Sequence, residues 1–191
     1  MAGRIRALVE TALEIAADDT HGYSQINRVG PDFDCSSFLA YCLRSVGFDI
    51  SVSGSWTGNL LTSLKSLGFV PVEDDEVQAG DIFLTPYHHV ALAVNDHELV
   101  HARISENGTI DGKPGDQTGT EICVTPMYIP DYGWDYQLRY EEPKKPGELD
   151  TAITTIARAV IRGDFGNGHE IRKELIYEMV RTRVNELMKG E

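Results

Sequence analysis

The apolar residues of the chain change their spacing after about residue 70, and this change constrains the fold more than any other feature. Over residues 4–17 they recur at every third or fourth position, which predicts an amphipathic helix. Similar patterns predict helices over 35–46 and 59–67, each followed by a glycine. Further along, short apolar runs bounded by turn residues predict strands over 81–85, 89–94, 98–102, 121–125 and 134–140. Helices followed by an antiparallel sheet predict an α+β fold.

A charged segment with two prolines separates this pattern from the rest of the chain. Residues 142–148 contain little that could be buried, and we interpret them as a linker. Residues 1–141 are then expected to form one domain. Residues 149–191 carry no strand signal and predict a small all-α unit. Within the first domain, the stretch 104–120 is rich in glycine turn pairs and predicts a loop or an edge hairpin.

The charge balance excludes several classes of partner. The chain has 17 Lys and Arg against 30 Asp and Glu, a net charge of −13, and residues 1–146 hold 22 of the acids and 10 of the bases. We expect no nucleic-acid partner and no anionic-membrane partner, because both need a basic surface. Membrane insertion is not expected either, because no apolar run approaches the roughly 20 residues that span a bilayer.

The N-terminus and the cysteine count indicate the compartment. Residues 1–19 contain acids where a secretory signal peptide has an apolar core, so we expect synthesis in a cytoplasm without a Sec-type signal. Three cysteines are an odd number and predict no disulfide framework, which fits a reducing compartment.

Cys35 is the first candidate for chemistry. It follows Asp34, and Asp is one of the residue types preferred at the N-cap of a helix. Cys35 would therefore lie in the first turn of a helix. The helix dipole and the outward-pointing N–H groups favour a thiolate there, so we expect a lowered thiol pKa. The same N–H groups could stabilise an oxyanion. Cys42 and Cys123 are interpreted as small apolar residues of the core.

Histidines on two consecutive strands supply a base and a group to orient it. A two-residue turn between the strands would place His88 on the same face as His101, whereas a three-residue connection selects His89. The sequence pattern leaves both registers open. The remaining histidines are isolated and expected to be solvated: His21, His97 and His169.

A metal site is the alternative use of these residues. Thiolate and imidazole are zinc ligands, so Cys35, His89 and His101 could bind zinc in a metal-binding protein. The only closely spaced pair, His88 and His89, points to opposite faces of a strand. We therefore expect neither a metal nor another cofactor.

Three motifs occur in the order found in a known family. The chain resembles the bacteriophage cysteine peptidoglycan hydrolases, which belong with the NlpC-like and CHAP amidase folds and are papain-like. The resemblance covers roughly residues 5–140. Its motifs are Tyr23-Ser24-Gln25 with Gly30-Pro31-Asp32-Phe33-Asp34-Cys35-Ser36-Ser37-Phe38, then Gly80-Asp81-Ile82 with His89-Val90-Ala91, and finally Leu99-Val100-His101-Ala102.

The resemblance implies a role for each matching residue. Cys35 would be the nucleophile and His89 the base, which selects His89 over His88, while His101 would orient His89. Tyr23 would help to stabilise the oxyanion. Further residues would line the substrate groove: Asp34, Ser36 and Trp56. A core tryptophan is an equally good interpretation of Trp56.

The C-terminal part resembles a second family. Residues 156–168, with Arg172-Lys173 and 183–187, are similar to the cell-wall-binding repeat of pneumococcal-phage lysozymes, a three-helix bundle that binds the muropeptide unit. The resemblance implies wall-binding roles for Phe165, Asn167 and Arg172. Phe165 stands where Trp is common, and the segment after Leu175 is shorter than in the usual repeat. A helical dimerisation tail is the alternative.

Together these features predict an endolysin that acts on bacterial peptidoglycan and waits in the host cytoplasm before release. It would cleave an amide bond by a Cys-His-His thioester mechanism. The bond is either γ-D-glutamyl (or D-glutaminyl) to the diamino acid, or N-acetylmuramoyl to L-alanine. The alternatives are a non-catalytic wall-binding protein on a hydrolase scaffold and the metal-binding protein above. The oligomeric state stays open.

Overall fold

The computed structural model describes residues 3–72 and 76–142. The chain divides into two compact units, residues 1–142 and 143–191, and only the first contains described residues. The linker beyond residue 142 and the helical unit over 149–191 lie outside the described residues. They stay predictions.

Three helices form where the sequence predicts them: α1 (Gly3–Ala16), α2 (Cys35–Ser45) and α3 (Thr57–Ser66). Helix α3 begins two residues before the predicted start. The cause is Asn59, whose side-chain Oδ1 accepts a hydrogen bond from the backbone N–H of Trp56 at 3.0 Å. Asn59 therefore caps the first turn from inside the helix instead of starting it.

Six strands form one antiparallel sheet in the order β1-β6-β2-β3-β4-β5. Their bounds are β1 Phe69–Pro71, β2 Ile82–Thr85, β3 His89–Ala93, β4 Glu98–Ala102, β5 Ile122–Pro126 and β6 Tyr136–Tyr140. The predicted strands are confirmed, and β1 is an addition. With three residues, β1 is too short to show a period, and it forms by pairing with β6. Residues 104–120 contain no strand and form a loop.

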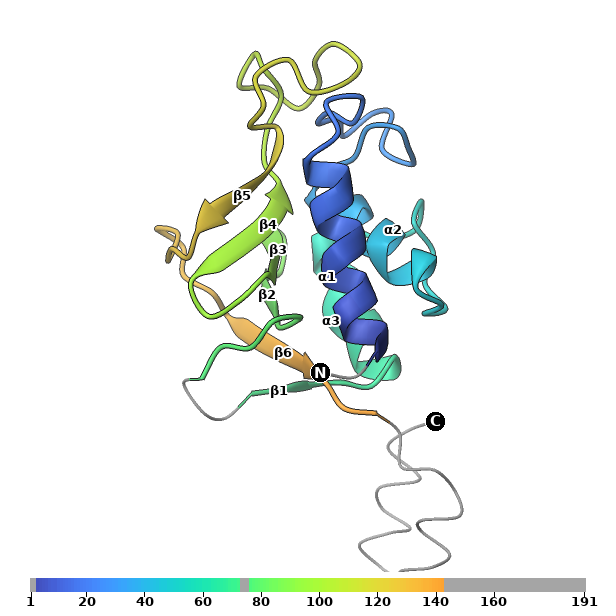
Figure 1. The fold of residues 1–191 in the computed structure, drawn as a ribbon, viewed down its shortest axis with the longest axis vertical. Helices are drawn as coiled ribbons and strands as arrows, with labels where there is room; N and C mark the ends of the chain where they lie inside the picture. The colour runs from blue at the N-terminus through green and yellow to red at the C-terminus, as the bar shows by residue number, and fades with distance from the viewer. Residues whose placement is uncertain (1–2, 73–75, 143–191) are drawn as a thin grey trace, which may run out of the picture. The chain divides into compact units, whose positions relative to one another are not determined.

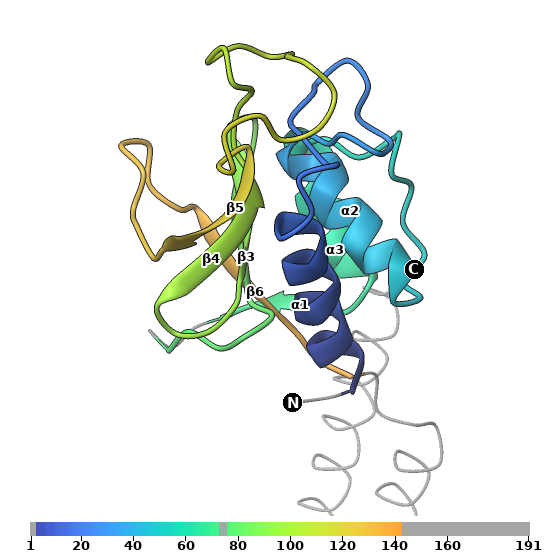
Figure 2. The ribbon, with the colours of Figure 1, turned by 45° about the horizontal axis from the view of Figure 1, so that its top comes forward.

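The three helices cover one face of this sheet (Figures 1 and 2). Residues such as Val90, Leu92 and Val100 point to that face and share one buried cluster with the helices. Alternate residues such as Ala91 and Leu99 point to the opposite face, where Tyr128 and Trp134 pack on them, with other residues of a smaller cluster. The predicted α+β architecture is confirmed, with the main core between helices and sheet.

Residues 94–97 join β3 to β4, and three of them, 95–97, form the turn between Val94 and Glu98. Leu92 pairs with Val100, and the N–H of Val94 donates to the carbonyl of Glu98 at 2.9 Å. This register puts His89 and His101 on one face of the sheet, together with Ala91 and opposite to Val90. The structure thus adopts the register that selects His89.

Two long loops meet at one end of the sheet (Figures 1 and 2). The loop 17–34 precedes α2, and the loop 103–121 joins β4 to β5. The N–H of Gln25 donates to the carbonyl of Ile110 at 2.8 Å, so the first loop is fixed against the second. Among the described residues, no helix is long and apolar enough to cross a membrane.

Candidate active site

The N-terminus of α2 is closed by a reciprocal capping box. The Asp34 carboxylate accepts hydrogen bonds from the N–H groups of Ser36 at 3.0 Å and Ser37 at 2.8 Å. In return, the hydroxyl of Ser37 accepts from the N–H of Asp34 at 3.0 Å. Cys35 is consequently the first residue of α2, as the sequence predicts.

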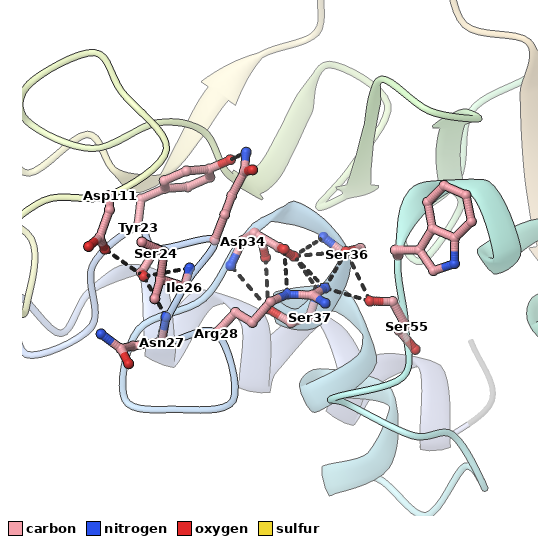
Figure 3. Close-up of polar contacts among 12 residues, drawn as sticks. Tyr23, Ser24, Ile26, Asn27, Arg28, Asp34, Ser36, Ser37, Ser55 and Asp111 are labelled. Carbon is pink, nitrogen blue, oxygen red and sulfur yellow. Dashed lines mark hydrogen bonds and ion pairs between the residues drawn. The ribbon is translucent and has the colours of Figure 1, made fainter.

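Arg28 holds this cap from the side, and no motif in the sequence indicates its role. Its Nη2 donates to Asp34 Oδ1 at 3.0 Å, to Ser36 Oγ at 2.8 Å and to the carbonyl of Ser55 (Figure 3). Its Nε forms an ion pair with the same carboxylate. Arg28 thereby joins the loop before α2 to the loop before α3. It also balances the charge of Asp34 beside the cysteine.

Asp34 and Ser36 both line the pocket that contains Cys35. Their polar atoms are, however, engaged within the protein. Ser36 Oγ donates to Asp34 Oδ1 at 2.8 Å while it accepts from Arg28. Both residues are buried, with exposed fractions of 8% and 2%.

Cys35 is half-buried, and its thiol is neutral at rest. Burial raises the pKa of Cys35 to about 12, and the charge of Asp34 adds to this rise. The N–H groups of Val90 and Ser36, and the charge of Arg28, act in the opposite direction. The predicted lowering of this pKa is therefore wrong, because burial outweighs the helix terminus. Because the backbone N–H of Val90 acts on the pKa of Cys35, the sulfur lies next to the start of β3.

His89 and His101 contact each other across neighbouring strands. His89 Nε2 lies 2.7 Å from His101 Nδ1, and His101 Nε2 lies 3.2 Å from the hydroxyl of Thr125 on β5. Burial lowers the pKa of His89 to about 4 and that of His101 to about 3. The positive charge of Arg103 contributes to both shifts. Both rings are neutral near pH 7 as a result.

A cavity of about 390 Å³ brings these groups together. Its lining consists of Tyr23, Gln25, Asp34, Cys35, Ser36, Trp56, Thr57, Tyr87, His88, His89, Arg103 and Tyr132. The predicted nucleophile, base and tyrosine thus share one pocket, and His101 lies directly behind His89.

Aromatic side chains surround the mouth of this pocket. Trp56 is 47% exposed and packs its ring edge-to-face with Tyr87, with ring centroids 5.3 Å apart. This exposure excludes the interpretation of Trp56 as a core residue. His88 stacks on Tyr132 with centroids 4.8 Å apart. Tyr87 has φ +68°, a conformation uncommon outside glycine, and is 74% exposed.

Comparisons with known proteins identify the family of the chain. The family model described as bacteriophage peptidoglycan hydrolase matches residues 15–129, more than half of the chain. The chain belongs to this family. A second model, described as an endolysin-like domain, matches residues 99–185. The chain is thus an endolysin that hydrolyses peptidoglycan at amide bonds, and the bacterial cell wall is where it acts.

Several solved structures are similar to this hydrolase, and one of them is a P60 domain. The P60 domain of an antigen from M. avium subspecies paratuberculosis is 18% identical in sequence, with a TM-score of 0.44. The match covers 71% of this chain and 96% of that chain. No curated protein matches the hydrolase.

Tyr23 is buried in the wall of the pocket of the hydrolase, with 6% of its surface exposed. Its hydroxyl accepts a hydrogen bond from Gln25 Nε2 at 2.8 Å. Burial raises the pKa of Tyr23 to about 12, so the hydroxyl keeps its proton at neutral pH. Its backbone N–H donates to Glu121 Oε2 at 2.9 Å, which fixes Tyr23 to the end of the loop 103–121.

The other cysteines and histidines have structural positions. Cys42 lies in the main core as predicted, whereas Cys123 is buried on β5 outside both apolar clusters. His97 is exposed and contacts Asp96, in agreement with the prediction. His21 was predicted to be solvated; it is only partly exposed, and its Nδ1 lies 2.6 Å from the carbonyl of Pro31.

Within the described residues, no group of three or more His, Cys, Asp or Glu side chains could hold a metal ion. The residues predicted for wall binding lie outside the described residues, and so does one histidine: Phe165, Asn167, Arg172 and His169.

Proposed function

We propose that the hydrolase cleaves its amide bond through a thioester on Cys35. The observation that carries this proposal is the placement of the Cys35 thiol in one pocket with the neutral imidazole of His89, itself held by His101. A nucleophile beside a base that is oriented by a third group is the arrangement that nucleophilic catalysis requires. The bond is either γ-D-glutamyl to the diamino acid or N-acetylmuramoyl to L-alanine.

The hydrogen-bond chain behind His89 defines which of its nitrogens acts as the base. When His101 Nε2 donates to the hydroxyl of Thr125, His101 Nδ1 is the acceptor. It then accepts from His89 Nε2 at 2.7 Å. This leaves Nδ1 of His89 unprotonated, as a base for the thiol. We propose that His101 acts as a positioning residue that fixes this tautomer.

Because the thiol and the imidazole are both neutral, nucleophilic attack and proton transfer occur together in the first step. As Cys35 Sγ attacks the carbonyl carbon, its proton passes to His89. The backbone N–H of Cys35 and the hydroxyl of Tyr23 stabilise the oxyanion. The described contacts of that hydroxyl use its oxygen as an acceptor from Gln25, which leaves its own hydrogen for the substrate.

Collapse of the tetrahedral intermediate breaks the C–N bond. His89 donates its proton to the departing amine, and the acyl group stays on Cys35 as a thioester. His89 then takes a proton from water, which attacks the thioester, and the thiol leaves with that proton. The cycle consumes one water and regenerates the neutral pair.

The other predicted groove residues shape two sides of the pocket. Asp34 and Ser36 shape the floor of the pocket, and Arg28 keeps them in place. Trp56 forms an exposed wall together with Tyr87, which suits contact with an apolar face of the substrate.

Substitution of the nucleophile tests the proposal. The parental enzyme and the variants Cys35→Ala and Cys35→Ser are incubated with purified cell walls. Mass spectrometry identifies the ends that the parental enzyme releases. A new free amine on the diamino acid indicates an endopeptidase, and one on L-alanine indicates an amidase. Loss of all release in Cys35→Ala is expected; release at the parental rate would refute the mechanism.

The two alternatives give different results in the same assay. A non-catalytic wall-binding protein releases nothing in the parental form. A metal-dependent enzyme loses activity with EDTA, whereas the proposed enzyme keeps its activity in EDTA and loses it with iodoacetamide.

We also propose that residues 149–191 bind the wall through Phe165, Asn167 and Arg172. The support is the resemblance to the wall-binding repeat, together with the endolysin-like model that extends to residue 185. The test is sedimentation of the full-length Cys35→Ala chain with insoluble walls, with and without Phe165→Ala. Unchanged sedimentation in the double variant would contradict this role for Phe165.

A further inference from the structure

Arg103 occupies a place in the pocket that the proposed mechanism does not use. It directly follows β4, and its backbone N–H donates to the carbonyl of Glu121 at 2.7 Å, which fixes its main chain. Its side chain lines the cavity that contains Cys35 and His89. The residue as a whole is exposed. An exposed side chain on an anchored main chain is suited to contact a ligand.

The charge of Arg103 is not neutralised within the described part of the chain. Other arginines there contact carboxylates: Arg6 contacts Glu10, Arg28 contacts Asp34 and Arg139 contacts Asp81. For Arg103, no carboxylate partner occurs among residues 3–72 and 76–142. Its contact among these residues is with the thiol of Cys123: burial raises the pKa of Cys123, and a side-chain hydrogen bond with Arg103, together with its charge, opposes that rise. Arg103 thus lines the pocket, and no carboxylate of the described residues neutralises its charge.

A cation such as Arg103, without a carboxylate partner among the described residues, is unusual in so acidic a domain. Residues 1–146 hold 22 Asp and Glu against 10 Lys and Arg. The carboxylate in the pocket lining, Asp34, is already paired with Arg28. The pocket therefore presents a local positive charge on a strongly acidic domain. Such a charge attracts an anionic group, and a planar guanidinium binds a carboxylate in bidentate geometry.

We propose that Arg103 is a specificity-determining residue that binds a carboxylate of the peptidoglycan stem peptide, namely the free α-carboxylate of the D-isoglutamyl residue. The proposal rests on the proposed function. In the stem order L-alanine, D-isoglutamate, diamino acid, this carboxylate lies on the acyl residue of the γ-D-glutamyl bond. It lies one residue beyond the N-acetylmuramoyl–L-alanine bond. Both candidate bonds therefore bring it within about one residue of Cys35.

In this role, Arg103 would distinguish between two chemical forms of the stem peptide. Some stem peptides carry the free D-isoglutamyl carboxylate, and others carry the neutral D-isoglutaminyl amide. A guanidinium has only donors, so it pairs with the carboxylate through two charge-assisted bonds. Towards the amide it can donate only to the one carbonyl oxygen, which carries no negative charge. The hydrolase should therefore distinguish the two wall chemistries at this position.

The test uses two synthetic N-acetylmuramoyl tripeptides that differ only in carboxylate or carboxamide at this position. The kcat/KM of each is measured for the parental enzyme, Arg103→Gln, Arg103→Lys and Arg6→Gln. Arg6 is an exposed arginine on α1 that pairs with Glu10, so Arg6→Gln makes the same change in net charge away from the pocket. Mass spectrometry of the products records which bond each enzyme cleaves.

The expected parental preference for the free acid is on the order of tenfold, the size of one charge-assisted contact at an exposed site. In Arg103→Gln this ratio falls to about one, because the loss on the acid substrate exceeds any change on the amide substrate. Arg103→Lys keeps part of the preference, and Arg6→Gln keeps all of it.

Three results would overturn the assignment: a parental ratio of one or less, an unchanged ratio in Arg103→Gln, or a ratio in Arg103→Lys no larger than in Arg103→Gln. Failure of the proposed function is recognised separately, because it requires Cys35→Ala to cleave either substrate. An inactive Cys35→Ala with an unchanged ratio in Arg103→Gln refutes the role of Arg103 alone.

Discussion

His89 and His101 lie in direct contact, with Nε2 of the first 2.7 Å from Nδ1 of the second. A contact of this length between two neutral rings holds one proton between two nitrogens. His89 therefore cannot rotate freely, and its other nitrogen is presented to the pocket in a defined state. The contact depends on the strand register, because Leu92 pairs with Val100 only when three residues connect the strands.

The first prediction concerns the pH dependence of catalysis. Burial lowers the pKa of His89 to about 4, and the base must be neutral to accept the thiol proton. We expect kcat/KM on a soluble muropeptide to stay flat from about pH 8 down to pH 5. It should fall by half only near pH 4. An acid limb with its midpoint between pH 6 and 7 would contradict a buried neutral base.

The same histidines should make folding stability depend on pH. The pKa values of His89 and His101 are both lowered by burial, so the unfolded chain binds protons at a higher pH than the folded one. Stability is therefore complete above about pH 6.5 and is lost as the pH falls towards 4. Urea unfolding at pH 7 and pH 5 should differ by about 2–4 kcal/mol.

A matched variant separates this effect from general acid denaturation. His101→Gln removes one of the two groups, so the loss between pH 7 and pH 5 should fall to about half, whatever the absolute stability of the variant. An equal loss in the parental chain and in His101→Gln would show that His101 does not cause it.

Thr125 should act on the rate through His101. Its hydroxyl lies 3.2 Å from His101 Nε2, and it is the acceptor that fixes the tautomer in the proposed chain. Thr125→Val keeps the shape of the side chain but removes the acceptor, so we expect kcat to fall about tenfold with KM unchanged. Thr125→Ser should restore most of the rate. Equal rates in the Val and Ser variants would argue against this role.

Arg28 should contribute both to stability and to the reactivity of Cys35. Arg28→Met leaves the buried carboxylate of Asp34 without its cation, at a cost of about 3–5 kcal/mol of unfolding free energy. The loss of this cation also removes one of the effects that lower the pKa of Cys35, so thioester formation should slow.

The double variant Arg28→Met with Asp34→Asn is the control for this pair. It removes the unpaired charge and should recover a large part of the lost stability. The measurement is urea unfolding of the four proteins in a double-mutant cycle. A coupling free energy near zero would mean that the ion pair does not hold the α2 terminus.

Local signals explain what the sequence could predict. The helix at Cys35 follows from Asp34 and Ser37, which satisfy each other within one turn. Strand β1 gave no signal, since Phe69–Pro71 depends on pairing with β6, some 70 residues away. The register that pairs His89 with His101 was likewise undecided by pattern alone, because it depends on the length of one connection.

The electrostatic features of the pocket were less accessible from sequence. Helix position alone predicted a reactive thiol at Cys35, yet its pKa depends mainly on burial, which the tertiary packing sets. Arg28 and Arg103 carry no motif and become significant through what faces them. Arg28 faces a buried carboxylate, and Arg103 faces the open pocket. A motif identifies residues that lie close together along the chain, whereas Arg28 and Arg103 reach the pocket only through the tertiary fold.

The last prediction concerns Glu121, which links the loop 103–121 to Tyr23, the proposed donor to the oxyanion. Glu121 is 1% exposed, and its two carboxylate oxygens accept from the N–H of Tyr23 at 2.9 Å and of Gln117 at 3.0 Å. In Glu121→Gln one oxygen becomes an NH₂ group, which must face a backbone N–H as donor against donor. We expect a loss of about 1–3 kcal/mol in unfolding free energy.

Because Tyr23 loses or shifts its backbone anchor, kcat should fall in Glu121→Gln while KM stays nearly constant. Glu10→Gln is the matched control: it makes the same charge change on exposed α1 and should alter neither quantity by much. Thermal unfolding and steady-state kinetics on one soluble muropeptide measure both effects. If stability falls and kcat does not, Glu121 supports only the loop. A fall in kcat at temperatures where the variant is fully folded assigns it the positioning of Tyr23.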